Sequence, residues 1–345
     1  MTKKLVTIAI ASYNNSQYIE RCVDSVINQT YKNIEVLIVD DGSTDDTKAV
    51  CEPYHKDNHI CFVSKENGGL SSVRQMALDL ATGDYICFID ADDYLADTYV
   101  ESMLQKMLID KSNVCVCSTE FVNEKGVKLQ KESNSFLCKE SEKPVRVTPS
   151  KLSDYANPEI IQLHLSDSWN KMYELAFLKN TRVQFCMPKG LNGTDSLFNK
   201  LVALHSPLYS VVGEIGYIHV IYKSSAVHRK KKNLIRSYLT ISEKTIAECE
   251  KIGIRQQMEQ YISEKLYAQL YMAYLDVYRE TESYRDALSE LRAIYSEYKE
   301  FVHKHWVKEV GVRQIRTHSV KMFIMMLRWC KPIVPFYVRM RESIK

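Results

Sequence analysis

The six residues Phe88-Ile89-Asp90-Ala91-Asp92-Asp93 join an apolar run to a cluster of carboxylates. The apolar run over residues 85–89 predicts a short buried strand, which ends in three aspartates. Like charges so close together repel one another, and partial burial adds a desolvation cost. A divalent cation such as Mg²⁺ or Mn²⁺, which prefers oxygen ligands, supplies the missing positive charge. The stretch therefore predicts a metal site at the carboxyl end of a strand, although a polar turn before a helix capped by Asp97 would also explain it.

The composition is that of an ordinary globular protein. The chain has 345 residues, enough for two domains or for one large domain with an extension, and it is 45% hydrophobic and 26% charged. A formal net charge of +3 gives no indication of a nucleic-acid partner. The ten cysteines form no CxxC pair, so we expect buried thiols in a reducing compartment. We recognise no signal peptide and no apolar run long enough to span a bilayer, so we expect a cytoplasmic protein, at most peripheral at the inner face of the plasma membrane.

The periodicity of the first 120 residues predicts alternating strands and helices. Apolar runs typical of strands lie at residues 5–11, 34–39, 60–63, 85–89 and 114–117, and apolar residues at helical spacing separate them. Such alternation implies βαβ units and a mainly parallel, twisted α/β sheet.

Beyond residue 120 the pattern is looser. Residues 121–150 are polar and weakly periodic, which predicts a loop excursion. Helices are predicted from Leu175 and behind Asp195, and a strand over residues 216–222. From about Asn233 the pattern is helical almost to the end, which predicts a separate C-terminal region.

Polar groups follow three of the predicted strands, at residues 12–14, 40–42 and 90–93. Because the carboxyl ends of parallel strands meet at one edge of a sheet, these loops should line one crevice. There Tyr13 would stack on a base, and Arg74 would meet a diphosphate. Each residue also has a structural interpretation, as a residue at a helix start or on a solvated helix face.

Taken along the chain, these strand ends resemble the motifs of glycosyltransferase family 2. The motifs are Ser12-Tyr13-Asn14, Asp40-Asp41-Gly42-Ser43, Asn67-Gly68-Gly69 with Arg74, and Gly83-Asp84-Tyr85 leading to Asp90-Ala91-Asp92-Asp93. The match is dense over residues 3–120 and looser to about residue 228. The resemblance implies the GT-A fold, which is a nucleotide-binding α/β domain with a DxD metal motif.

The resemblance also implies where a nucleotide-sugar donor binds. Tyr13 and Asp41 would contact uracil, with Asp40 beside them. Ala11 and Arg74 belong to the same predicted donor site.

A metal ion completes the predicted donor site. Asp92 would be the main ligand of Mn²⁺ or Mg²⁺, with Asp90 and Asp93 near the ribose, the metal and the donor sugar. Ala91 lies inside the same motif and is predicted to contact the donor, a UDP-sugar.

The acceptor side rests on a second block. In this family an Asp near the acceptor acts as general base, usually within a Glu-Asp pair; here the pair is Thr194-Asp195, so Asp195 takes that position. Trp169-Asn170-Lys171 matches a tryptophan–lysine motif that shapes the sugar site, although a core role would also explain Trp169.

The predicted activity is a metal-dependent inverting transfer of a hexose or N-acetylhexosamine to a saccharide or a lipid-linked saccharide, in the synthesis of a bacterial surface polysaccharide. One alternative is a sugar nucleotidyltransferase, which would need a glycine-rich phosphate loop where Ser12-Tyr13-Asn14-Asn15 stands. The other is a non-catalytic binding or scaffold protein that kept the fold.

We predict a catalytic domain over residues 1–228 and a helical region over residues 229–345. Within that region, residues 303–345 carry ten Lys or Arg against two Glu, interleaved with aromatic and aliphatic residues. Such a basic amphipathic stretch suits a membrane surface, but it also suits packing on the catalytic domain or on a second subunit of a homo-oligomer.

Overall fold

The computed structural model describes residues 3–129, 137–152, 157–205, 207–222, 233–259, 261–263, 265–266 and 284–305. The chain divides into two compact units, residues 1–230 and 231–345. The predicted boundary between residues 228 and 229 lies outside the described residues.

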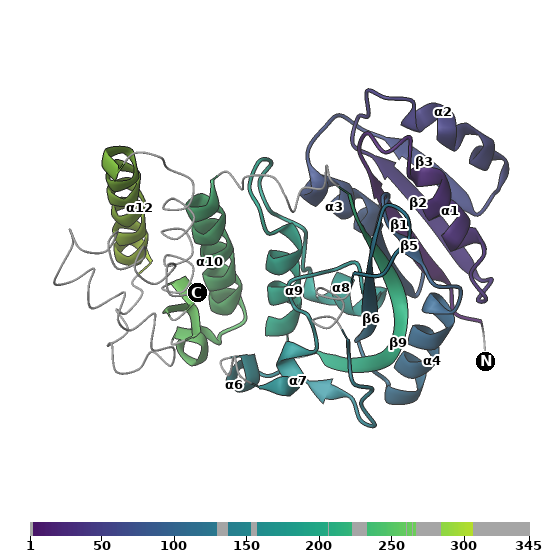
Figure 1. Cartoon of the computed structure of the whole chain (residues 1–345). Coiled ribbons are helices and arrows are strands. Elements are labelled where there is room, and N and C mark those ends of the chain that lie inside the picture. Colours follow the sequence, from purple (N-terminus) through teal and green to yellow (C-terminus); the bar gives the residue numbers. More distant parts are fainter. Residues whose placement is uncertain are drawn as a thin grey trace. The chain divides into compact units, whose positions relative to one another are not determined.

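A single sheet forms the centre of the first unit (Figure 1). Within the described residues its strands are β1 (Val6–Ser12), β2 (Ile34–Asp40), β3 (Ile60–Ser64), β4 (Tyr85–Asp90), β5 (Tyr94–Leu95), β6 (Val114–Asn123), β7 (Val145–Arg146), β8 (Lys171–Glu174) and β9 (Leu208–Ile221). Their order is β3-β2-β1-β4-β8-β6-β9-β5, and β7 also pairs with β9. The α/β class predicted from the sequence is confirmed.

The sheet is more mixed than the alternation of strands and helices predicted. Strands β3, β2, β1 and β4 are parallel, as expected. Strand β8, however, runs antiparallel to both of its neighbours, β4 and β6. The segment 121–150 is also less loop-like than predicted, because β6 continues to Asn123 beside the long strand β9.

Helices cover both faces of this sheet (Figure 1). They are α1 (Ile19–Ile27), α2 (Thr47–Cys51), η1 (Glu52–Lys56), α3 (Leu70–Leu80), α4 (Tyr99–Asp110), α6 (Pro149–Leu152), α7 (Pro158–Ile161), α8 (Leu175–Thr181) and α9 (Thr194–Leu204). Helices α1 and α4 bury their apolar stripes in one core cluster with alternate residues of β1, β2 and β4. Helix α4 has Thr98, and not Asp97, at its N-cap, so the alternative interpretation of Asp97 as the cap of this helix is wrong.

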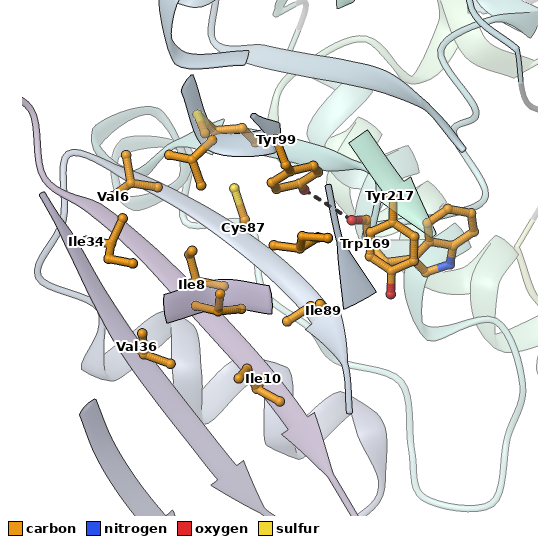
Figure 2. Close-up of a cluster of buried hydrophobic side chains, with 14 of the residues drawn as sticks. Val6, Ile8, Ile10, Ile34, Val36, Cys87, Ile89, Tyr99, Trp169 and Tyr217 are labelled. Carbon is orange, nitrogen blue, oxygen red and sulfur yellow. Dashed lines mark hydrogen bonds between the residues drawn. The ribbon is translucent and has the colours of Figure 1, made fainter. Parts of the chain in front are cut away.

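The alternation of side chains along the strands builds the two cores. Ile8, Ile10 and Ile89 point into the cluster that α1 and α4 close, together with Tyr99 and Trp169 (Figure 2). On the opposite face, Phe88 makes edge contacts with the rings of Tyr173, Phe185 and Phe198. The strand that precedes Asp90 is therefore buried on both faces, which fixes where its carboxyl end emerges.

The described part of the second unit is largely helical. It contains α10 (Leu234–Lys251) and α12 (Tyr284–Lys304), with Ile241, Ile246 and Cys249 buried on α10. The predicted basic tail lies outside the described residues from residue 306 onward. Among the residues that are described, we find no helix with the length and apolarity needed to cross a bilayer.

Candidate active site

The carboxyl ends of β1, β2 and β4 meet at one edge of the sheet. Ser12 pairs in register with Asp40, and Ala11 pairs with Asp90. A cleft of about 660 Å³ opens beside them. It is lined by Ala11, Ser12, Tyr13, Asn14, Asn15, Tyr18, Asp41, Asn67, Gly69, Leu70, Val73, Asp90, Ala91, Asp92 and Tyr222. The crevice that the sequence predicted is therefore present.

Tyr13 provides an open aromatic surface in this cleft. Tyr13 is 49% exposed, whereas the neighbouring residue of its loop is fixed by hydrogen bonds. Asn14 adopts a left-handed conformation, receives the backbone N–H of Thr44 at 2.8 Å and donates its own N–H to Ser43. The ring is thus available to stack on a flat ligand without the loop having to reorder.

Asp41 and Asp40 have different environments although they are neighbours. Asp41 lines the cleft and accepts the backbone N–H groups of Gly68 and Gly69, both at 2.8 Å, and the Lys65 ammonium at 3.0 Å. Asp40 is buried and accepts bonds from Ser43 and Ser64. Asp40 is not among the residues that line the cleft, so its place in the structure is that of a turn-stabilising residue.

Asp92 places a partly buried carboxylate in the cleft. Burial, together with the nearby Asp93 and Asp90 carboxylates, raises the pKa of Asp92 to about 7. Within the described part of the chain, no other residue donates a hydrogen bond to this carboxylate. Its backbone carbonyl, in contrast, is held by Arg21 at 2.7 Å and by the Tyr222 hydroxyl at 3.2 Å. Two hydrogen bonds therefore hold the backbone of a residue whose carboxylate faces the cleft without a hydrogen bond from another described residue.

Asp93 differs from the sequence-based expectation of a metal ligand. Its side chain is fully buried and accepts the Tyr217 hydroxyl at 2.6 Å, the His219 imidazole at 2.8 Å and the Val220 backbone N–H at 2.8 Å. Although burial opposes the imidazolium charge, Asp93 raises the pKa of His219 to about 9. Asp93 is thus the buried anchor of β9, with its oxygens already used by protein donors.

We predict that Asp93→Ala lowers the free energy of unfolding by roughly 3–5 kcal/mol, because it leaves a buried charged imidazole and two further donors unpaired. Urea unfolding of the metal-free protein measures this loss. The exposed carboxylate of Asp97 supplies the control Asp97→Ala, which should stay within about 0.5 kcal/mol of the wild type. A metal-free Asp93→Ala protein as stable as the wild type would contradict this structural role.

The chemistry of the donor set fits a divalent cation held mainly by Asp92. The described residues contain no group of three or more His, Cys, Asp or Glu side chains arranged as a metal site. Asp92 offers an oxygen ligand in the cleft whose pKa is raised first by burial and then by the Asp93 and Asp90 carboxylates, and a cation would offset that repulsion. Such a cation would take its other ligands from diphosphate oxygens and water, as Mg²⁺ commonly does.

A second cavity of about 330 Å³ lies beside the first. It is lined by residues of the loop 187–193, by the first residues of α9, including Asp195, and by the start of α3. Gly69 and Leu70 line both cavities. The predicted base therefore faces a space that adjoins the predicted donor cleft.

Arg74 does not line either cavity. It is 1% exposed, and its guanidinium pairs with Asp90 at 2.6 Å through one nitrogen and with Asp195 through the other. The predicted contact between Arg74 and a diphosphate is therefore not prepared in this structure. Its partners are the two carboxylates.

Neither Trp169 nor Lys171 is among the residues that line the two cavities. Trp169 is 7% exposed and packs on the rings of Tyr217 and His219. Lys171 is fully buried and donates to the carbonyl oxygen of His164 at 2.8 Å; burial lowers the pKa of this ammonium to about 8. The core interpretation of Trp169 fits this packing better than a direct contact with the sugar.

Sequence reasoning missed the residues that hold the Asp92 backbone. Arg21 lies over the Tyr94 ring and donates to the Tyr222 hydroxyl at 2.7 Å. Tyr222 also contacts the Tyr18 ring, with centroids 4.3 Å apart. Tyr18 directly precedes α1 and Arg21 lies in its first turn, but nothing local to either one indicates a partner at the end of β9.

Comparison with known proteins finds similarity to glycosyltransferases and to a polysaccharide synthase. Residues 7–172 match the family model described as glycosyl transferase family 2. The chain is 29% identical over 252 residues to the putative glycosyltransferase EpsH of Bacillus subtilis (strain 168), covering 72% of this chain and 70% of that protein. It is 35% identical over 211 residues to the hyaluronan synthase of Pasteurella multocida, covering 57% of this chain but only 21% of the synthase.

Solved structures show the same fold. The crystal structure of S. aureus TarS in complex with UDP-GlcNAc superposes with a TM-score of 0.72 at 20% identity, covering 98% of this chain and 91% of that one. The GT-A fold predicted from the sequence is thereby confirmed.

Proposed function

We propose that this chain, which carries a glycosyltransferase family 2 domain over residues 7–172, transfers a sugar from a UDP-sugar to a hydroxyl group of a saccharide acceptor. The observation that carries the proposal is the pair of adjoining cavities, one lined by Tyr13 and Asp92 and the other by Asp195. They offer an aromatic platform for a nucleotide, a carboxylate for a cation, and a base in the neighbouring space.

The donor cleft binds by stacking and by charge. Tyr13 stacks on the uracil ring, and Asp41, whose oxygens are already oriented by Gly68 and Gly69, lies at the same wall of the cleft. Asp92 would hold a Mn²⁺ or Mg²⁺ ion, which would supply positive charge to the diphosphate leaving group. Arg21 and Tyr222 keep the Asp92 backbone in place while the donor binds.

The chemical step is one direct displacement. An oxygen of the Asp195 carboxylate takes the proton from the acceptor hydroxyl, and that hydroxyl oxygen bonds to the anomeric carbon. The bond from the anomeric carbon to the diphosphate breaks, and UDP leaves with the electron pair. Attack on the face opposite the leaving group inverts the anomeric configuration, so no protein nucleophile is needed.

The relatives support the choice of substrate class. TarS was crystallised with UDP-GlcNAc, and the hyaluronan synthase is named for a polysaccharide product. Both favour a UDP-hexose or UDP-N-acetylhexosamine donor and an acceptor that belongs to a growing bacterial capsule, exopolysaccharide or cell-wall glycan. A lipid-linked acceptor, contact with the membrane through the basic tail, and a homo-oligomer stay predictions.

A panel of UDP-sugars tests the proposed activity. We expect the purified full-length chain to release UDP from at least one UDP-hexose or UDP-N-acetylhexosamine with Mn²⁺ or Mg²⁺ present, and excess EDTA to stop the release. Donor binding without release, with acceptor saccharides also supplied, would instead identify a non-catalytic binding protein. With pyrophosphate added to the UDP-sugar, formation of UTP and a sugar 1-phosphate would identify a nucleotidyltransferase.

A further inference from the structure

We propose that Arg74 is a positioning residue that holds the base carboxylate of Asp195 and the donor-side carboxylate of Asp90 at a fixed separation. The inference rests on the proposed function, because it takes Asp195 as the group that accepts the acceptor proton. It replaces the role predicted from the sequence, in which Arg74 meets the diphosphate itself.

Arg74 lies on the buried face of helix α3. Helix α3 begins after Gly69, whose positive φ of 84° turns the chain into the helix, and its inner face buries Val73, Arg74 and Ala77. An arginine on the buried stripe of an amphipathic helix has lost its hydration, so its charge requires partners inside the protein.

The two partners are the second observation. Asp90 ends β4 and reaches one terminal nitrogen of Arg74 at 2.6 Å, while Asp195 in the first turn of α9 reaches the other. A guanidinium presents these nitrogens in one rigid plane, so pairing with both carboxylates fixes the position of each relative to the other. A single point charge such as an ammonium does not impose that geometry.

The position of the bridge between the cavities is the third observation. Asp90 lines the donor cleft and Asp195 lines the neighbouring cavity, and the two cavities share Gly69 and Leu70 at the start of α3. Arg74 lies about one turn further along the same helix, behind this shared wall. It therefore acts on a bound ligand through the two carboxylates and not by direct contact.

The pairing leaves Asp195 oriented for its task. Its Oδ1 is buried and forms an ion pair with Arg74 but no hydrogen bond with a described residue, while the side chain keeps 15% of its surface exposed where it lines the cavity. A base must lie within hydrogen-bond reach of the acceptor proton, and small misplacements of reacting groups are costly in rate. Loss of the bridge should consequently lower turnover while leaving donor binding nearly intact.

The test compares Arg74→Met, Arg74→Lys, Asp195→Asn and the Arg74→Met/Asp195→Asn double variant in the full-length chain. The readouts are kcat for UDP release from the best donor of the panel and the Kd of that donor by calorimetry. We expect Arg74→Met to lower kcat about 10²-fold and to change Kd less than about threefold. Arg74→Lys keeps the charge but not the fork, so it should recover about tenfold of that loss.

The double variant separates a positioning role from an independent one. If Arg74 acts through Asp195, the double variant should be no more than about threefold slower than Asp195→Asn alone. Should Arg74→Met fail to fold, Arg74→Lys by itself still tests the positioning role, because it should also lower kcat while leaving the donor Kd unchanged. Lys106→Met, which breaks the partly buried Lys106–Asp110 pair on α4, is the matched control and should leave both readouts unchanged.

Two results would overturn the inference. A Kd weakened tenfold or more with kcat retained would show that Arg74 binds the diphosphate directly, and multiplied effects in the double variant would show that it acts independently of Asp195. Neither outcome is confused with failure of the proposed function, which would appear as a wild-type chain that releases no UDP from any donor.

Discussion

Replacing Asp92 with alanine should lower UDP release from the donor by about 10³-fold or more, because several kcal/mol of charge stabilisation at the leaving group is lost. Asp92 lines the donor cleft, and no other described residue donates a hydrogen bond to its carboxylate. Burial and the nearby Asp93 and Asp90 carboxylates raise its pKa to about 7. The variant should also lose the dependence of UDP affinity on Mn²⁺. Calorimetric titration of UDP, with and without Mn²⁺, measures this second effect.

The exposed Asp97, which follows the same turn, supplies the matched control Asp97→Ala. That variant removes a carboxylate of the same size and should keep both the activity and the Mn²⁺ dependence. Full activity of Asp92→Ala, or of the wild type in excess chelator, would show that UDP release needs no cation held by Asp92.

Replacing Asp195 with asparagine should lower turnover by about 10²- to 10⁴-fold, the usual contribution of a general base. Asparagine keeps the size of the side chain and its ability to form hydrogen bonds, but it does not accept the acceptor proton. Donor affinity should stay near normal, because Asp195 lines the second cavity and not the donor cleft. Calorimetry with the donor and a UDP-release assay together measure the two effects.

A helix-capping role is the competing explanation for Asp195. Gly193 precedes α9 and no side-chain cap bond is made there, although an acid in the first turn still favours the helix dipole. Capping alone would cost about 1 kcal/mol of stability and leave turnover largely intact. Glu20→Gln, which changes an exposed acid in the first turn of α1, shows how large that purely structural effect is.

The sequence predicted the positions of the site residues better than their partners. The apolar run before Asp90 predicts a buried strand, and parallel strands end at one edge, so Tyr13, Asp41 and Asp92 were placed in one cleft correctly. The roles of Asp93 and Arg74 depend on contacts with β9 and α9, more than a hundred residues away. Local spacing carries no information about such partners.

The same limit explains the errors in the fold. Strand β8 has only four residues, and its local pattern does not specify its direction. It lies antiparallel between β4 and β6, and its first residue, Lys171, is fully buried. A lysine is rarely buried, so the sequence favours an exposed position for Lys171. In the structure its ammonium group is buried and donates hydrogen bonds to three backbone and side-chain oxygens.

The anomeric configuration of the product shows whether the sugar is transferred in one direct displacement. Proton NMR of the wild-type chain with Mn²⁺, an α-linked UDP-sugar selected by the panel and a saccharide acceptor follows the anomeric signal as the product forms. We expect the first product to carry the inverted, β configuration, and we expect EDTA to prevent its appearance. A first product with retained configuration, or no consumption of any donor, would contradict this expectation.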